Sequence, residues 1–186
     1  MKNSKHMKSI LLLAFGAATL IGTSSFSHLQ KQNKSLAIAY VKTDAQFLVR
    51  AAEINLEEIQ LGQLAQKKST MTDVKELGEM MEKGHTQSLS DLTTLASKKG
   101  IALPKSVTAE AKEEYKELNN KSEKRFNDEF CEVMIKGHKQ AIALFEAASK
   151  DSKDSEIKEW AAATLPALRM HLDHAKTCKE KCEKMD

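Results

Sequence analysis

The stretch from residue 72 to 99, TDVKELGEMMEKGHTQSLSDLTTLASKK, carries the repeat that decides the fold. It contains no proline, and its apolar residues, with one histidine and one serine among them, recur at steps of three and four. That spacing places them along one face of an α-helix, the face that a bundle buries. This seam comprises Val74, Leu77, Met81, His85, Ser88, Leu92 and Leu95. Gly100 then ends the predicted helix, with Pro104 close behind.

The same periodicity recurs along the rest of the chain. It predicts long helices over residues 44–67, 122–149 and 154–181, and a short connector helix over 107–119. Pro166 lies inside the last helix and predicts a local kink. The link between the second and third long helices is long enough to run the length of a bundle. The sequence therefore predicts an all-α, ferritin-like four-helix bundle with a connector helix between helices two and three, and an up-down-up-down bundle is the alternative.

The N-terminus has the three parts of a secretory signal peptide. Basic residues precede an apolar run over 10–21, and small residues follow up to an expected cut after Ser27. The apolar run is shorter than the roughly 20 residues of a membrane span, and no later segment is apolar enough. We therefore expect a signal peptide over 1–27, a flexible tether over 28–43 and the bundle domain over 44–182. The mature protein is expected in the periplasm or elsewhere in the cell envelope, without spanning a membrane.

The charge of the chain argues against nucleic acid as a partner. The formal net charge is +3, from 29 basic and 26 acidic residues. Three of the lysines, Lys2, Lys5 and Lys8, lie in the leader, which has no acidic residue, so 26 basic residues remain against 26 acidic ones. Nucleic-acid binding needs a clustered cationic face, and a nearly neutral mature protein does not predict one.

Each long helix carries one strongly polar residue near the middle of its apolar seam: Glu58, His85, His138 and His171. A buried carboxylate or imidazole costs several kcal/mol unless it is paired or ligated. One such residue per helix at similar depth predicts a shared layer, and glutamate with histidines suits copper, zinc or iron. The alternative is a metal-free network in which Glu58 hydrogen-bonds one or more histidines.

A short repeat accompanies two of these histidines. MEKGH at residues 81–85 matches MIKGH at 134–138, so Met81 and Met134 each share a helix face with the histidine four residues on. Thioether with imidazole favours copper, although methionine also fills gaps in a core. Glycine inside a helix is unfavourable, and its position before each histidine suggests close backbone approach or room for a ligand.

The cysteines follow from the same register. If His138 faces His171 in an antiparallel pair, Cys131 lies opposite Cys178, one heptad away. This predicts a Cys131–Cys178 disulfide, with Cys182 free or in place of Cys178. The rival is a metal-binding end on one helix, whose neighbouring residues are three or four apart: His171, His174, Cys178 and Cys182.

Several stretches together resemble one known family: EEIQLG at 57–62, MEKGH at 81–85, MIKGH with LFE up to residue 146, and TLPAL to HL over 164–172. In order and spacing they are similar to the exported, ferritin-like domain-of-unknown-function family 4142, often labelled as outer membrane proteins. The resemblance covers about residues 44–178. It implies a ferritin-like bundle in the envelope, with Glu58, His85, His138 and His171 at matching positions, and it brings no established activity. The family usually has an acidic residue where this chain has Gly84 and Gly137, and the cysteine-containing tail lies outside its pattern.

We therefore expect an exported, non-catalytic bundle that can hold a transition metal in its core. The alternative is a metal-free structural or stress-related envelope protein, in which the polar layer fixes the register of the helices. A di-iron oxidase is disfavoured because such sites need carboxylates from two helices and two Glu-x-x-His motifs. This chain has one such motif, over 82–85, with Glu82 off the seam. No feature of the sequence indicates a protein partner or an oligomeric state.

Overall fold

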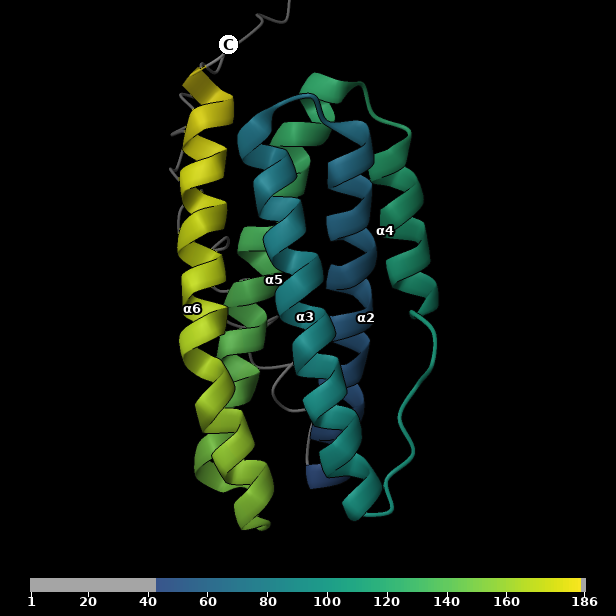
Figure 1. The fold of residues 1–186 in the computed structure, drawn as a ribbon, viewed down its shortest axis with the longest axis vertical. Helices are drawn as coiled ribbons and strands as arrows, with labels where there is room; N and C mark the ends of the chain where they lie inside the picture. The colour runs from purple at the N-terminus through teal and green to yellow at the C-terminus, as the bar shows by residue number, and fades with distance from the viewer. Residues whose placement is uncertain (1–42, 185–186) are drawn as a thin grey trace, which may run out of the picture.

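The computed structural model describes residues 43–184, which form five α-helices and no β-strand. The long helices lie side by side, and the short one lies on the outside of the bundle (Figure 1). The helices are α2 (Asp44–Lys68), α3 (Thr72–Lys98), α4 (Ala109–Asn119), α5 (Glu123–Asp151) and α6 (Ser155–Lys184). The all-α prediction is confirmed. The predicted signal peptide and all but the last residue of the predicted tether lie outside the described residues. No described helix combines the length and apolar character that crossing a membrane requires.

The helices pair in two hairpins. Short turns join α2 to α3 and α5 to α6, and each pair packs closely along its length. Between the hairpins, the segment that contains α4 returns the chain to the end of the molecule where α3 began (Figure 1). As a result α3 and α5 run in the same direction, while α4 packs against α2 and α5.

Local signals fix several helix ends. The Thr43 hydroxyl accepts a hydrogen bond from the Gln46 amide at 3.2 Å, and the Thr108 hydroxyl accepts one from the Ala111 amide at 3.1 Å. Both contacts satisfy amides that a helix start leaves without partners. Gly100 has φ 66°, the left-handed conformation that glycine adopts without steric cost, and it follows the end of α3 as expected.

A polar layer divides the core of the bundle into two apolar clusters. One cluster holds Phe47, Leu92, Phe145 and Ile157, and the other holds Leu61, Met81, Phe130 and Cys178. On every long helix the polar residue falls between the residues of the two clusters. Nearly all of the buried polar side chains of the described residues belong to this layer: Asn55, Glu58, His85, His138 and His171. The predicted register of the seams therefore brings these residues to one height.

Candidate metal centre

Three histidines from three helices meet in the polar layer: His85 on α3, His138 on α5 and His171 on α6. Each is at most 4 % exposed. The Nε2 atoms of His85 and His138 are 3.4 Å apart, and His138 Nε2 lies 3.3 Å from His171 Nδ1. All three nitrogens lie within 4.8 Å of one another. Metal–nitrogen bonds of about 2.0–2.1 Å in a tetrahedron separate the ligand nitrogens by roughly 3.3–3.4 Å, so the observed spacing suits a metal ion.

Hydrogen bonds on the outer sides of two rings fix their tautomers. His138 Nδ1 lies 2.8 Å from the Met134 carbonyl oxygen, and His85 Nδ1 lies 2.9 Å from the Asn55 amide oxygen. The Met134 carbonyl oxygen only accepts hydrogen bonds, so His138 Nδ1 carries the proton and its Nε2 presents a lone pair. With the Asn55 amide oriented so that its oxygen faces His85, the same assignment holds for His85. The two Nε2 atoms therefore face each other across 3.4 Å with no proton between them. Support of this kind behind a histidine is typical of metal sites.

Burial keeps these rings neutral. It lowers the pKa of His85 well below its ordinary value, with the neighbouring histidines adding to the effect. It also lowers the pKa of His138, and it brings the pKa of His171 to about 4. Neutral imidazole is the form that binds a metal ion. The rings therefore do not take up a proton at neutral pH that would remove the repulsion between the two facing lone pairs. A metal cation bound among the three nitrogens would remove it.

Glu58 lies beside the histidines but outside the converging nitrogens. Its Oε1 is 3.7 Å from His138 Nδ1, the ring nitrogen that faces away from the other two histidines. Burial raises the pKa of Glu58 well above its ordinary value, with Glu57 and Glu114 adding to the rise, so the contact is not an ion pair. Its Oε2 is buried without a hydrogen-bond partner. The three histidines and Glu58 thus share the expected layer, but only the three histidines converge, with Glu58 on the outer side of His138.

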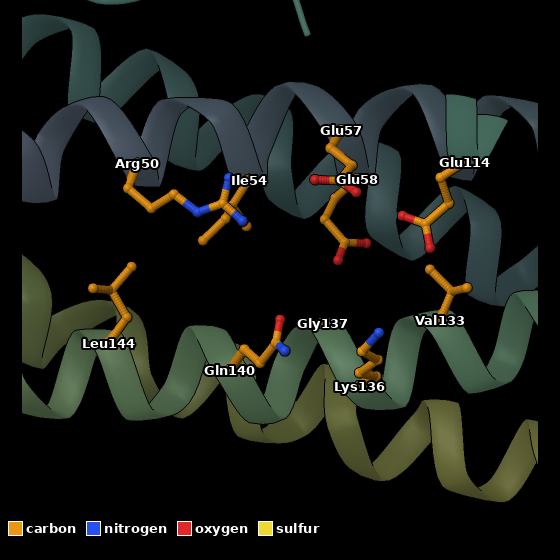
Figure 2. Close-up of a pocket in the computed structure, with 10 residues that line it drawn as sticks. All are labelled: Arg50, Ile54, Glu57, Glu58, Glu114, Val133, Lys136, Gly137, Gln140 and Leu144. Carbon is orange, nitrogen blue, oxygen red and sulfur yellow. The ribbon is translucent and has the colours of Figure 1, made fainter. Parts of the chain in front are cut away.

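A cavity of about 120 Å³ lies between α2, α4 and α5. Figure 2 shows the Glu58 carboxyl group pointing into it. Glu57, Glu114 and Lys136 also line this cavity. Burial, followed by a hydrogen bond with Glu114, raises the pKa of Glu57 to about 7. A Cβ atom at Gly137 would lie 3.0 Å from Glu58 Oε1, so the glycine leaves room for the carboxyl group.

Gly84 likewise leaves room for the ring of a histidine. A Cβ atom there would lie 2.7 Å from His171 Cε1 and 2.9 Å from its Nε2, closer than side chains approach. The absence of a side chain therefore lets the His171 ring lie against α3. Each repeated glycine thus leaves room for a side chain of a neighbouring helix, whereas the prediction was close backbone approach or room for a ligand.

The methionines and His174 lie elsewhere. Met81 and Met134 are fully buried in the apolar cluster that also holds Leu61 and Phe130, and Met134 supports His138 through its main-chain oxygen. His174 is exposed on α6. The predicted metal-binding end of His171, His174, Cys178 and Cys182 does not form, because His171 joins the histidines and both cysteines join Cys131.

The three cysteines are free thiols. Cys131 Sγ lies 3.0 Å from Cys178 Sγ and 4.0 Å from Cys182 Sγ. The prediction that Cys131 faces Cys178 is confirmed, but the predicted disulfide is absent, since an S–S bond is about 2.05 Å long. The hydrogen bond between them raises the pKa of Cys131 and lowers that of Cys178, and burial raises the pKa of Cys182 to about 11.

The sequence reasoning missed Asn55. It is 2 % exposed and holds the outer nitrogen of His85. Its position in the sequence indicates that it is buried, because it follows Ala51 by four residues and precedes Glu58 by three. That is the spacing of residues on a buried helix face. Ile54 fits the same spacing, three residues after Ala51 and four before Glu58, and it is only partly buried.

Comparisons with known proteins place the chain in a family. The model of the domain of unknown function DUF4142 matches residues 29–178, and the chain belongs to this family. No curated protein sequence matches the chain. Among solved structures, the chain is similar to a crystal structure of a DUF305 fragment from Deinococcus radiodurans, with a TM-score of 0.67 and 13 % identity. The match covers 76 % of this chain and 97 % of that one, and at this identity it shows a shared fold.

Proposed function

We propose that this member of the DUF4142 family is an exported, non-catalytic bundle that binds one divalent transition-metal ion through His85, His138 and His171. We also propose that its fold is a ferritin-like four-helix bundle, with α4 in the long crossover. The common direction of α3 and α5 supports this topology over an up-down-up-down bundle, in which consecutive helices alternate.

One observation carries the proposal of a metal ion. The tautomers of His85 and His138 are fixed by acceptors behind each ring, so two lone pairs point at each other across 3.4 Å. His171 Nδ1 can donate a hydrogen bond to His138 Nε2, but the neighbour of His85 Nε2 is this same His138 Nε2, which is an acceptor. A buried polar atom without a partner costs about 1–3 kcal/mol. A metal ion at the centre would convert this repulsive arrangement into three ligand bonds.

The ligand set favours zinc or copper over iron. Three neutral imidazoles at tetrahedral spacing form a common zinc site, and copper binds nitrogen ligands more tightly than other divalent ions of its row. Non-haem iron sites usually add carboxylates, and the neighbouring Glu58 lies on the outer side of His138. The fourth coordination position would be left to water or remain vacant.

The surroundings support a binding role over an oxidase. The Glu82 carboxylate, part of the single Glu-x-x-His motif, accepts hydrogen bonds from Gln63 at 2.8 Å and Gln66 at 2.7 Å. It is thereby held against α2 and away from His85. A di-iron oxidase needs such carboxylates as ligands. The nearly complete burial of the three histidines also leaves little space for a substrate beside the ion.

Export to the periplasm or cell envelope is proposed from the leader pattern of residues 1–27. Expression of the full chain with a C-terminal tag, followed by cell fractionation, tests it. We expect a shortened protein in the envelope fraction. A protein of full length in the cytosol would contradict the proposal.

Metal analysis of the purified protein, with cobalt(II) as an optical probe of tetrahedral sites, tests the metal centre. We expect one equivalent of cobalt(II) bound at the histidines by the wild type and none there by His171→Gln. The matched control is His174→Gln, which removes an exposed histidine three residues further along the same helix and should leave binding unchanged.

The metal-free envelope protein is the competing function. Its support is that Asn55 and the Met134 carbonyl already satisfy one nitrogen of two histidines, as in a buried polar network. In that case neither zinc, copper nor cobalt would bind under aerobic or reducing conditions. Replacing the three histidines together with leucine would then leave the unfolding temperature unchanged or higher.

A further inference from the structure

Three thiol sulfurs gather near the end of the bundle where α3 begins, and the Met71 thioether contacts one of them. Cys131 comes from α5, Cys178 and Cys182 come from α6, and Met71 precedes α3. The three thiol sulfurs lie within 4.8 Å of one another, and Cys182 Sγ is 3.8 Å from Met71 Sδ. These residues come from segments far apart in the sequence, so the fold itself assembles the cluster.

The spacing of the sulfurs fits a bound ion. Bonds of about 2.3 Å to sulfur separate the ligands of one ion by roughly 3.8–4.0 Å. The distance from Cys131 Sγ to Cys182 Sγ is 4.0 Å, and Cys182 Sγ to Met71 Sδ is 3.8 Å. The contact between Cys131 and Cys178, at 3.0 Å, is shorter than this separation and would have to open by about 1 Å. Rotation of one thiol about its Cα–Cβ bond supplies a movement of this size.

The cluster is reachable from solvent on one side. Cys131 is fully buried and Cys178 is 3 % exposed, while Cys182 is 9 % exposed. Cys182 and Met71 line an open cavity together with Asn127. The side-chain oxygen of Asn127 is buried there without a hydrogen-bond partner. An ion would therefore enter past Cys182 and Met71.

The chemistry of the ligands selects the ion. Thiolates and thioethers are soft ligands that favour copper(I). Zinc also binds thiolates, but its fourth ligand is a thiolate, an imidazole, a carboxylate or water, whereas the sulfur next to Cys182 here is a thioether. Three thiols that merely filled the core would be expected to contact separate apolar neighbours, since a thiol packs as a small hydrophobe.

We propose that Cys131, Cys178 and Cys182, with the Met71 thioether, form a second site that binds one copper(I) ion. Each thiol that binds loses its proton to solvent and forms an S–Cu bond, and no electron is transferred. The site goes beyond the proposed histidine centre and is separate from it. Cys178 follows His171 by seven residues on α6, about 10 Å along the helix.

Anaerobic titration of the reduced full chain with copper(I), supplied as its acetonitrile complex against a chromophoric copper(I) chelator, tests the proposal. We expect one copper(I) with near-ultraviolet thiolate charge-transfer absorption and only sulfur neighbours in X-ray absorption. Three reactive thiols should fall to at most one when the ion binds. Cys182→Ser should weaken binding at least tenfold. His171→Gln should leave it unchanged, which separates this site from the histidine centre.

Met71→Leu provides the sharper variant, because it removes the thioether and keeps the apolar volume. We expect it to weaken copper(I) binding several-fold. Its matched control is Met80→Leu, a partly buried methionine that packs against the same apolar cluster, which should bind as the wild type does. Copper(I) binding of unchanged strength in Cys182→Ser, or a nitrogen shell around the copper, would overturn the proposal. So would an unreduced protein with a Cys131–Cys178 disulfide whose reduced form takes up no copper(I).

Discussion

Substitution of Gly84 by alanine isolates the contribution of one glycine to the histidine centre. The added Cβ would lie 2.7 Å from His171 Cε1, whereas ordinary contacts begin at 3.4 Å, so the ring must move by about 0.7 Å. Metal–nitrogen bonds of about 2.0–2.1 Å do not tolerate a displacement of that size. The His171 Nδ1 atom would leave bonding range while the rest of the site stayed in place.

The expected magnitude separates binding from stability. Alanine favours a helix over glycine by about 1 kcal/mol, and overpacking a core costs about 1–3 kcal/mol. The metal-free protein should therefore lose only about 0–2 kcal/mol of its free energy of unfolding. Loss of the supported position of a ligand weakens metal binding about 10–100-fold, or about 1.4–2.7 kcal/mol. Zinc affinity by competition with a chelator and thermal unfolding without metal measure the two effects.

Gly137→Ala is the matched control, because it makes the same change at the same place in the repeated motif. Its Cβ would meet Glu58 Oε1 at 3.0 Å, the end of a flexible side chain that faces a cavity. We expect less than about a threefold change in zinc affinity, since no proposed ligand moves. Equal affinities for Gly84→Ala and the wild type would refute the assignment of His171 as a ligand.

Three further outcomes follow from the site. Asn55→Ala removes the hydrogen-bond acceptor of His85 Nδ1 and should weaken zinc binding about 10–100-fold in the same competition assay. An unchanged affinity would show that this hydrogen bond does not contribute to zinc binding. Zinc at 100 times its dissociation constant should stabilise the wild type by about 2.7 kcal/mol, raising its unfolding temperature by about 5–10 °C, and the shift should vanish in His171→Gln. The pKa of Glu57 is raised to about 7 in the folded protein, so the unfolded chain releases this proton at a lower pH than the folded protein does. The free energy of unfolding should therefore fall as the pH rises from about 4.5 to 7, and then level off. Discounted for partial exposure, this fall is about 1–2 kcal/mol, and denaturant unfolding of Glu57→Gln should show a flatter profile; an equally steep one would assign the fall to another group.

Hydrophobic periodicity was enough to predict the helices. The expected ends of the four long helices lie within three residues of the observed ones. Capping and glycine signals mark some of these ends, such as Thr43 before α2 and Gly100 after α3. Periodicity also brought His85, His138 and His171 to one height, since residues at equal distances from the ends of packed helices meet in a layer. These properties depend on spacing along one helix at a time, which the sequence contains directly.

Periodicity did not determine which atoms of that layer converge. Glu58 is buried as expected, but whether it faces His138 Nε2 or Nδ1 depends on the rotation of α2 against α5. A rotation of one position along the seam also exchanges Ile54 for Asn55, which explains why the support of His85 was missed. Such rotations are set by packing between helices, including the close approach that Gly62 and Gly78 allow between α2 and α3.

The family model covers the histidine centre and the sulfur cluster to different extents. The histidines lie inside the stretch matched by the family model, whereas the match ends at Cys178 and leaves Cys182 beyond it. Both clusters share α6, yet about 10 Å of helix separates them, far enough for substitutions in one to act independently of the other. A double variant of His171→Gln and Cys182→Ser should therefore lose zinc and copper(I) binding by the same factors as the single variants. A larger or smaller combined loss would mean that the centres are coupled through α6, and that occupation of one alters the position of the other.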